Sequence, residues 1–187
     1  MSLAQLDRQT ILQEIIADVE TPYPSMSWWK PWRECISDDD MFLRDEDRNE
    51  DAERFFERTG VVVKNMGNNA YYIETDTVSV KMYDIFRSAD QYYITLAHEI
   101  IHWTGAASRL DRFGALTIGT LAFEEIVAQL GAVFICADLS IVPPTYDNDA
   151  AYVAGWLAKA GGDKHTIIAA ATAAETAADF LKRAGGL

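Results

Sequence analysis

The chain has 187 residues, 49% of them hydrophobic, which is enough for one domain with a proper core or one domain with a short appendage. Sixteen basic and 29 acidic residues give a formal net charge of −13, and such a surface repels the phosphate backbone of nucleic acids. No run of about 18 apolar residues is present, so no membrane span is expected. Charges at Asp7, Arg8 and Glu14 argue against a signal peptide. Cys35 and Cys136 are not expected to pair, which indicates a reducing, cytoplasmic location.

Residues 1–49 are expected to form an N-terminal segment in front of a main domain, residues 50–187. The spacing of apolar residues within 3–20 predicts an amphipathic helix. Residues 21–32 contain three prolines and three tryptophans, and the prolines are incompatible with a regular helix or strand. Residues 36–53 are mostly acidic, and we expect an exposed linker in their first half.

A helix that begins in the second half of this acidic stretch is expected to end near Thr59, with Gly60 as its C-cap. Residues 61–63 then predict a short strand. Residues 70–83 show the period-two alternation of a half-buried strand. We expect this second strand at the edge of a small sheet, where residues 77–83 would pair with an extended peptide.

Ser88, with Gln91 three positions later, matches a capping box and predicts a helix that runs to Thr104 and stops at Gly105. Three further helices are predicted over residues 120–138, 149–160 and 164–184. Thr120 is the expected N-cap of the first of these helices. The order of the elements predicts an α+β fold with a small mixed sheet first and a helical C-terminal part after it.

The segment HEIIH carries the clearest chemistry, with His98, Glu99 and His102. Two histidines four positions apart lie about 40° apart around a helix, so both imidazoles can bind one ion. Glu99 lies on a flank of the same face, where it can reach a water on the metal and act as general base. Two of the chain's three histidines fall in this pattern, which favours a zinc site over two structural histidines.

A zinc site with two histidines and a water lacks one protein ligand. The apolar stretch LAFEEIVAQLGA offers Glu124 and Glu125, and a carboxylate there is costly unless it is paired or binds a metal. We expect Glu125 to be the ligand, because Gln129 lies four positions later and can support a ligand on the same helix face. Glu124 is left either to hold a histidine or to face solvent.

Other polar residues are expected to have different roles. His165 begins an alanine-rich segment without a spaced partner, so it is expected at the surface. Arg109 is expected to pair with a carboxylate just after the motif helix. A peptidase also needs a group that stabilises the oxyanion, and the sequence does not choose among the candidates Tyr92, Tyr93, Tyr152 and Arg109.

Three blocks, YYITLAHEIIHWTGAASRLDR, AFEEIVAQLGAVFICADL and the alanine-rich tail, resemble the C-terminal metallopeptidase-like domain of ArdC-type antirestriction proteins, which are zincins. The resemblance covers residues 50–184. It implies a zincin-like metallopeptidase fold, a plasmid or phage origin, and a metal site built from the two histidines, the intervening glutamate and a later glutamate. Members usually also carry an N-terminal domain that binds single-stranded DNA. Residues 11–32 resemble the beginning of that domain, so we expect its DNA-binding core to be missing.

The sequence therefore predicts a zinc-dependent peptidase of the gluzincin kind, with Zn²⁺ as cofactor and a peptide or protein as substrate. Two alternatives stay open. In the first, the zincin fold is a non-catalytic module that binds a host protein; in the second, the chain binds single-stranded DNA through residues 28–32, Arg109 and Arg112. Nucleic acid is not an expected partner because the charge balance is acidic. Substrate identity and oligomeric state are left open.

Overall fold

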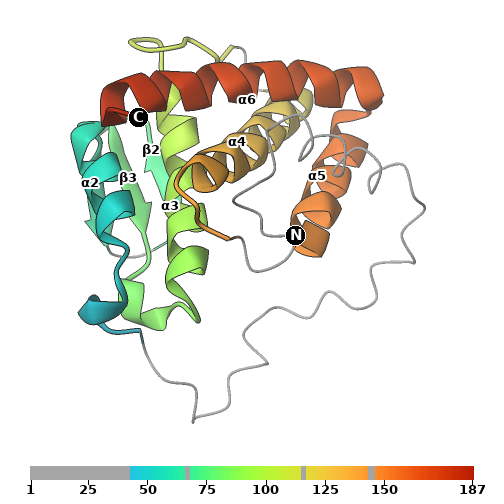
Figure 1. Ribbon diagram of the computed structural model, residues 1–187. Coiled ribbons are helices and arrows are strands. Elements are labelled where there is room, and N and C mark those ends of the chain that lie inside the picture. The colour runs from blue at the N-terminus through green and yellow to red at the C-terminus, as the bar shows by residue number, and fades with distance from the viewer. Residues whose placement is uncertain (1–42, 66–67, 115–116, 143–145) are drawn as a thin grey trace.

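A computed structural model describes residues 43–65, 68–114, 117–142 and 146–187 (Figure 1). The predicted helix over residues 3–20, the segment 21–32 and Cys35 lie outside the described residues. The described part combines a three-stranded mixed sheet with long helices that follow it in the chain, and the predicted α+β class is confirmed.

The sheet has the strand order β1-β3-β2, with β1 spanning Val62–Asn65, β2 Ala70–Tyr72 and β3 Thr77–Val80. β1 pairs with β3 in parallel, and β2 pairs with β3 in antiparallel orientation. The single strand predicted over residues 70–83 is wrong, because a turn at residues 73–76 divides it into β2 and β3.

The expected edge position of residues 77–83 is also wrong. All four residues of β3 are buried, since this strand lies between β1 and β2 and packs against the helix that follows it. The alternation of apolar and polar residues therefore does not mark an exposed polar face in this strand. Within the described residues, β1 and β2 are the edge strands of the sheet.

Helix α2, Glu50–Arg58, comes before the sheet. The Asn49 side chain caps it by accepting hydrogen bonds from the backbone N–H groups of Asp51 and Ala52. Gly60 follows the helix with a φ of 77°, a left-handed conformation that glycine adopts without strain. The helix thus ends near Thr59 as predicted, although Thr59 is its C-cap and Gly60 follows one position later.

Helix α3, Ala89–Thr104, has Ser88 as its N-cap and stops at Gly105, as predicted. The Ser88 hydroxyl accepts from the Gln91 backbone, while the Gln91 amide accepts from the Arg87 backbone instead of the Ser88 backbone. Helix α4, Ile118–Asp138, begins slightly earlier than predicted. Its N-cap is Thr117 and not Thr120, because the Thr120 hydroxyl reaches back to the Thr117 backbone N–H and closes a reciprocal capping box.

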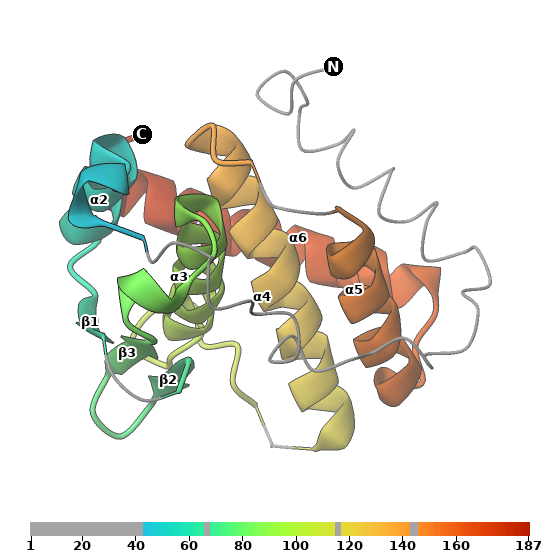
Figure 2. The ribbon, with the colours of Figure 1, turned by 90° about the horizontal axis from the view of Figure 1, so that it is seen from below.

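Helices α5, Tyr146–Ala160, and α6, Lys164–Gly185, complete the described fold, and Asp163 caps α6. Figures 1 and 2 show α6 running across one side of α3, α4 and α5. Alanine residues on the buried face of α6 allow this close crossing: Ala170, Ala171, Ala174, Ala177 and Ala178. In Figure 1, the sheet and α2 lie at one end of the described part of the molecule, and α5 lies at the other.

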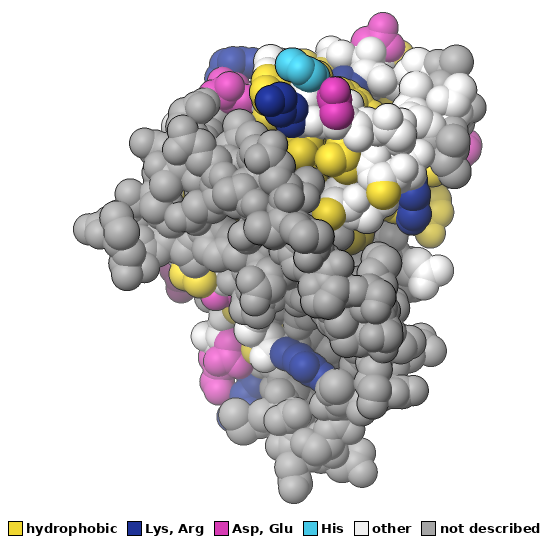
Figure 3. All heavy atoms as spheres, turned by 90° about the vertical axis from the view of Figure 1, so that its right-hand side faces the viewer, with side chains coloured by type: hydrophobic (Ala, Val, Ile, Leu, Met, Phe, Trp, Pro, Cys, Tyr) yellow, Lys and Arg dark blue, Asp and Glu magenta, His cyan; other side chains and the backbone are white. Residues whose placement is uncertain are grey.

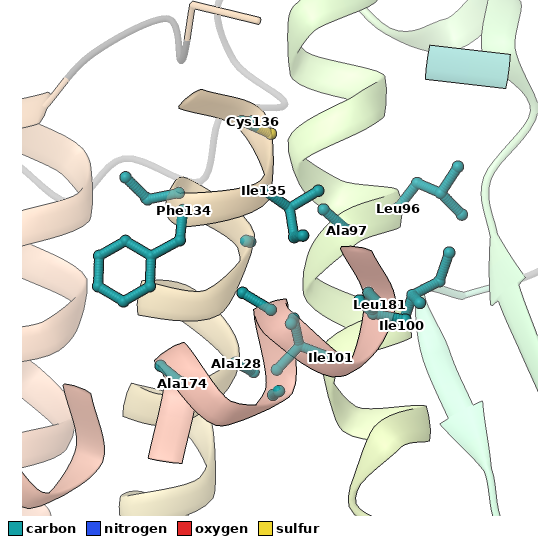
Figure 4. Packing of buried hydrophobic residues seen from close by; sticks show 14 of the residues in the cluster. Leu96, Ala97, Ile100, Ile101, Ala128, Phe134, Ile135, Cys136, Ala174 and Leu181 are labelled. Atoms are coloured by element: carbon teal, nitrogen blue, oxygen red, sulfur yellow. The ribbon is translucent and has the colours of Figure 1, made fainter. Parts of the chain in front are cut away.

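α4 is the central core helix and packs against α3, α5 and α6. Figure 4 shows how Ile100 and Ile101 of α3, Ile135 of α4 and Leu181 of α6 share one apolar core. By length and composition alone, the stretch Gly119–Asp138 would suffice to cross a membrane, but 67% of its most apolar window is buried inside the structure. Packing on three sides thus accounts for its apolar composition.

Candidate metal centre

Two helices bring the predicted ligands together. His98 and His102 lie one turn apart on α3, with ring centroids 4.9 Å from each other, and Glu125 faces them from α4. The His98 Nε2–Glu125 Oε2 distance is 3.6 Å and the His102 Nε2–Glu125 Oε1 distance is 3.7 Å. One ligand atom from each residue lies within 4.8 Å of the other two. Glu125, and not its neighbour Glu124, is therefore the glutamate that meets both histidines.

The other nitrogen of each imidazole is held from behind. His98 Nδ1 lies 3.2 Å from Gln129 Oε1, and His102 Nδ1 lies 3.2 Å from Glu124 Oε1. Each Nδ1–H can donate to an oxygen, which leaves the Nε2 lone pair directed toward Glu125. Such support fixes the tautomer and orientation of a metal-binding histidine. Glu124 thus contacts a histidine, which is one of the two roles expected for it, and Gln129 supports the His98 ring instead of Glu125.

The donor set fits a divalent ion such as zinc. Ligands at about 2.0–2.1 Å in a tetrahedron lie about 3.3–3.4 Å from one another. The nitrogen–oxygen distances of 3.6 and 3.7 Å would need to close by only a few tenths of an ångström. Two imidazoles and one carboxylate, with room for a fourth ligand, match the donor chemistry of catalytic zinc sites.

Tyr152 supports the carboxylate from helix α5. Its hydroxyl donates a hydrogen bond of 2.7 Å to Glu125 Oε2, and its ring packs edge-on against His98. Burial and the nearby Glu125 carboxylate raise the pKa of Tyr152 above its usual value, so the hydroxyl remains a donor at neutral pH. Tyr152 is the one oxyanion candidate of the four that lies beside the predicted ligands.

Glu99 and Glu125 have pKa values that are displaced in opposite directions. Burial raises the pKa of Glu99, which is 8% exposed, although the charges of His98 and His102 act against it. Burial also disfavours ionisation of Glu125, but its contact with His98, the charge of His102 and the bond from Tyr152 lower its pKa to about 2. A carboxyl group with a raised pKa suits proton transfer, and one with a lowered pKa suits ligation.

His98 is affected by the same carboxylates. Burial of its ring disfavours the charged form, yet the contact with Glu125 and the charge of Glu99 outweigh burial and raise the pKa of His98. Protons would therefore compete with a metal ion for the ring nitrogen of His98.

These groups line a cavity of about 630 Å³. The edge strand β2 and the turn after it form one wall, through Ala70, Tyr71 and Ile73. Thr120 and Leu121, in the first turns of α4, also line it. The side chains of Ile73 and Leu121 are 55% and 43% exposed, so the cavity has apolar groups that are open to a ligand.

Tyr92 and Tyr93 are placed elsewhere. Both are buried in an aromatic cluster, where the Tyr93 hydroxyl donates to Glu53 and the Tyr92 hydroxyl accepts from Asn65. Neither is among the described residues that line the cavity. His165 is exposed in the first turn of α6, as expected.

Arg109 pairs with a carboxylate, as the sequence predicts. It binds Asp76 and the Tyr71 hydroxyl, donates to the Trp103 carbonyl, and stacks on the Trp103 ring with 3.9 Å between the guanidinium carbon and the ring centroid. Arg109 thereby ties the turn between β2 and β3 to the end of α3. This role separates it from the neighbouring Arg112, which contacts Glu124 in the site and whose position there is not evident from the sequence.

The fold and the cavity define a class of protein. Residues 50–173 match the family model MPTase-PolyVal, described as zincin-like metallopeptidase, and the chain belongs to this family. The predicted zincin-like fold is thus confirmed.

Among solved structures, the chain is similar to the antirestriction protein ArdC from plasmid R388. It is 37% identical to the Mn(II)-bound form, with a TM-score of 0.63, over 78% of this chain and 54% of that one. The metal-free form gives 38% identity and a TM-score of 0.61, over 74% of this chain and 51% of that one. The resemblance to ArdC-type proteins that the sequence indicates is therefore confirmed.

Two other relatives are similar over most of the chain. The uncharacterized protein y4eC of Sinorhizobium fredii is 37% identical over 142 residues, which are 74% of this chain and 46% of that protein. A DNA primase TraC of Escherichia coli is 32% identical over 136 residues, which are 71% of this chain and 9% of the primase. The chain thus spans about half the length of y4eC and ArdC.

Proposed function

We propose that the chain is a zinc-dependent peptidase whose metal is held by His98, His102 and Glu125. One observation carries the proposal: both imidazoles present Nε2 to the same carboxylate, while Gln129 and Glu124 hold their Nδ1 atoms. The Mn(II)-bound structure of the similar protein ArdC adds support for a divalent metal in this fold.

The residues around the cavity would divide the work of hydrolysis. A bound ion would polarise the scissile carbonyl and make a nearby water more acidic. The Glu99 carboxylate would take a proton from the attacking water and deliver it to the departing nitrogen as the C–N bond breaks. Its raised pKa brings proton uptake and release closer to neutral pH. Tyr152 lines the cavity, and its hydroxyl would donate a hydrogen bond to the developing oxyanion only after leaving Glu125, to which its single proton is donated in this structure.

An extended peptide would bind along β2. Among the described residues this strand pairs only with β3, and Ala70 and Tyr71 lie on the cavity wall. Backbone hydrogen bonds to an edge strand give affinity without regard to sequence, while Ile73 and Leu121 would contact apolar side chains. The proposed strand for peptide binding is therefore β2, and not the segment 77–83 that the sequence indicated.

Cleavage of a broad peptide library tests this function. Wild-type protein loaded with zinc is compared with Glu99→Gln, which should keep the metal and lose about 10²–10⁴-fold in rate. Glu175→Gln is the matched control, because Glu175 is exposed on α6, which contributes no residue to the site. Equal cleavage by wild type and Glu99→Gln would refute the role of Glu99.

A second candidate is a metal-containing module that binds a host protein without hydrolysis. The similarity to the DNA primase TraC favours this candidate. The matched residues are only 9% of the primase, so a domain of this kind also occurs as one part of a much longer protein. Absence of cleavage by zinc-loaded wild type across the library would support this candidate.

Binding of single-stranded DNA has less support. Among the described residues on the face drawn in Figure 3, lysine and arginine side chains are separated by apolar, acidic and neutral ones. Arg109 and Arg112 both bind carboxylates within the fold. Fluorescence anisotropy at physiological salt should therefore show weak binding at most, whereas a micromolar affinity with a steep salt dependence would contradict this expectation.

A further inference from the structure

Arg112 lies behind the candidate metal centre and is almost fully engaged there. Its Nε and Nη2 atoms donate to both oxygens of Glu124, at 3.0 and 2.7 Å. Nη2 also donates to the Ile101 carbonyl, and Nη1 donates to the Thr104 hydroxyl, each at 2.7 Å. The Arg112 and Glu124 side chains are only 11% and 9% exposed.

These bonds converge on one ligand. Glu124 Oε1 contacts Nδ1 of His102, so the guanidinium reaches the ring through a single carboxylate. Ile101 and Thr104 stand on either side of His102 in the sequence, and their groups bind the same guanidinium at the C-terminal end of α3. Arg112 therefore holds both the helix turn that carries His102 and the carboxylate that orients its ring.

We propose that Arg112 is a positioning residue of the metal centre, which acts through Glu124 to fix the orientation and tautomer of His102. The inference rests on the proposed metal site. A planar guanidinium is needed because two parallel N–H groups bind the two oxygens of Glu124 while the remaining N–H groups reach α3. A lysine ammonium keeps the charge but cannot present this fork.

The chain provides a matched control three positions earlier. Arg109 is similarly buried, at 10% exposure, and also pairs with a carboxylate, Asp76. Its contacts hold the turn after β2 and do not include Glu124 or a histidine. Loss of a buried arginine in general and loss of this positioning role can thus be separated.

The test compares Arg112→Lys with Arg109→Lys by zinc affinity in chelator competition. Arg112→Lys should weaken binding about 10–100-fold, while Arg109→Lys stays close to wild type. In a Glu124→Gln background, Arg112→Lys should add little further loss, because both changes act on the same contact with His102. Wild-type affinity of folded Arg112→Lys, or fully additive effects with Glu124→Gln, would overturn the proposal.

A second readout is independent of metal. In the metal-free protein, ¹⁵N NMR of the imidazoles should show His102 protonated at Nδ1, and Arg112→Lys should populate the Nε2-protonated tautomer. An unchanged tautomer would contradict the positioning role. If wild type fails to bind zinc at all, the proposed metal site is refuted, and this signal still decides the role of Arg112.

A milder variant covers the case in which Arg112→Lys does not fold. Thr104→Val keeps the shape of the side chain and removes one anchor of the guanidinium without touching Glu124. It should weaken zinc binding several-fold. Wild-type affinity of folded Thr104→Val would then overturn the proposal.

Discussion

Gly131→Ala is expected to force apart the two helices that carry the candidate metal ligands. A Cβ atom at Gly131 of α4 would lie 2.7, 2.9 and 3.1 Å from Cδ1, Cγ1 and Cγ2 of Ile101 on α3. Rotation about χ2 would move only Cδ1. The other two atoms are fixed by χ1, which is restricted for a β-branched residue in a helix, and Ile101 is fully buried. The helices must therefore separate by a few tenths of an ångström.

The magnitude follows from two opposing effects. Overpacking of a well-packed core costs about 1–3 kcal/mol, and three close contacts place this site in the upper part of that range. Replacing glycine by alanine within a helix contributes about 1 kcal/mol of stability. The net expectation is a loss of about 1–2 kcal/mol in the free energy of unfolding. Gly119→Ala is the control in the same helix, because its Cβ meets nothing closer than 3.8 Å, and it should be neutral or slightly stabilising.

Urea unfolding of Gly131→Ala, Ile101→Ala and the double variant measures the effect. Ile101→Ala alone should cost about 2–5 kcal/mol, and the added methyl at position 131 should then be tolerated or favourable. The two changes should therefore couple by about 1–3 kcal/mol. A Gly131→Ala variant as stable as Gly119→Ala, or strictly additive effects, would refute the steric reasoning.

Three further predictions concern the site and its surroundings. Tyr152→Phe removes the 2.7 Å bond to Glu125 and should weaken zinc binding about 10-fold in chelator competition, and an unchanged affinity would exclude this support. Zinc occupancy in equilibrium dialysis should fall as the pH is lowered, and the loss should begin above the ordinary histidine pKa of about 6.5, because the raised pKa of His98 favours its protonation; occupancy that is independent of pH would exclude histidine ligands. The hydrogen bond with Arg109 lowers the pKa of Asp76, so Asp76 stabilises the fold above about pH 4 and loses this contribution as the pH falls through the lowered value. Asp76→Asn should therefore lose less stability than wild type between about pH 6 and pH 3 in urea unfolding, and equal losses would exclude a contribution from this pair.

Local signals predicted the helix that carries the motif. Ser88 and Gln91 mark its start, Gly105 follows its last residue, and the spacing of His98 and His102 places both rings on one face. Each of these features depends on residues within one or two turns, so the sequence alone is sufficient. The choice of Glu125 over Glu124 also depended on residues within a single helix, Glu125 and Gln129. In the structure, however, Gln129 contacts His98.

The sheet was predicted less well because its order depends on pairing between distant segments. The turn at residues 73–76 has neither glycine nor proline, and Asp76 takes the left-handed conformation, with a φ of 49°. Nothing local distinguishes β3 as the central strand. It pairs with β1, and β2 lies between these two strands in the sequence.

Arg112 was missed for a similar reason. Arg112 lies in the loop between α3 and α4, and its partner Glu124 lies 12 positions further on, in α4. In the sequence, Arg112 is only one of two neighbouring basic residues. The structure shows that the Arg112 guanidinium is buried and bound to a carboxylate, so it stabilises the fold and the site and is not available to bind phosphate. Such long-range contacts can be identified only when the packing of α3 against α4 is known.

Anomalous diffraction from crystals of the zinc-loaded chain, recorded on both sides of the zinc absorption edge, tests the central claim most directly. The account predicts one peak per chain, about 2.0–2.1 Å from Nε2 of His98, Nε2 of His102 and a carboxylate oxygen of Glu125. A chain that binds one equivalent of zinc in solution but shows its peak at other residues, or no peak between α3 and α4, would contradict the account.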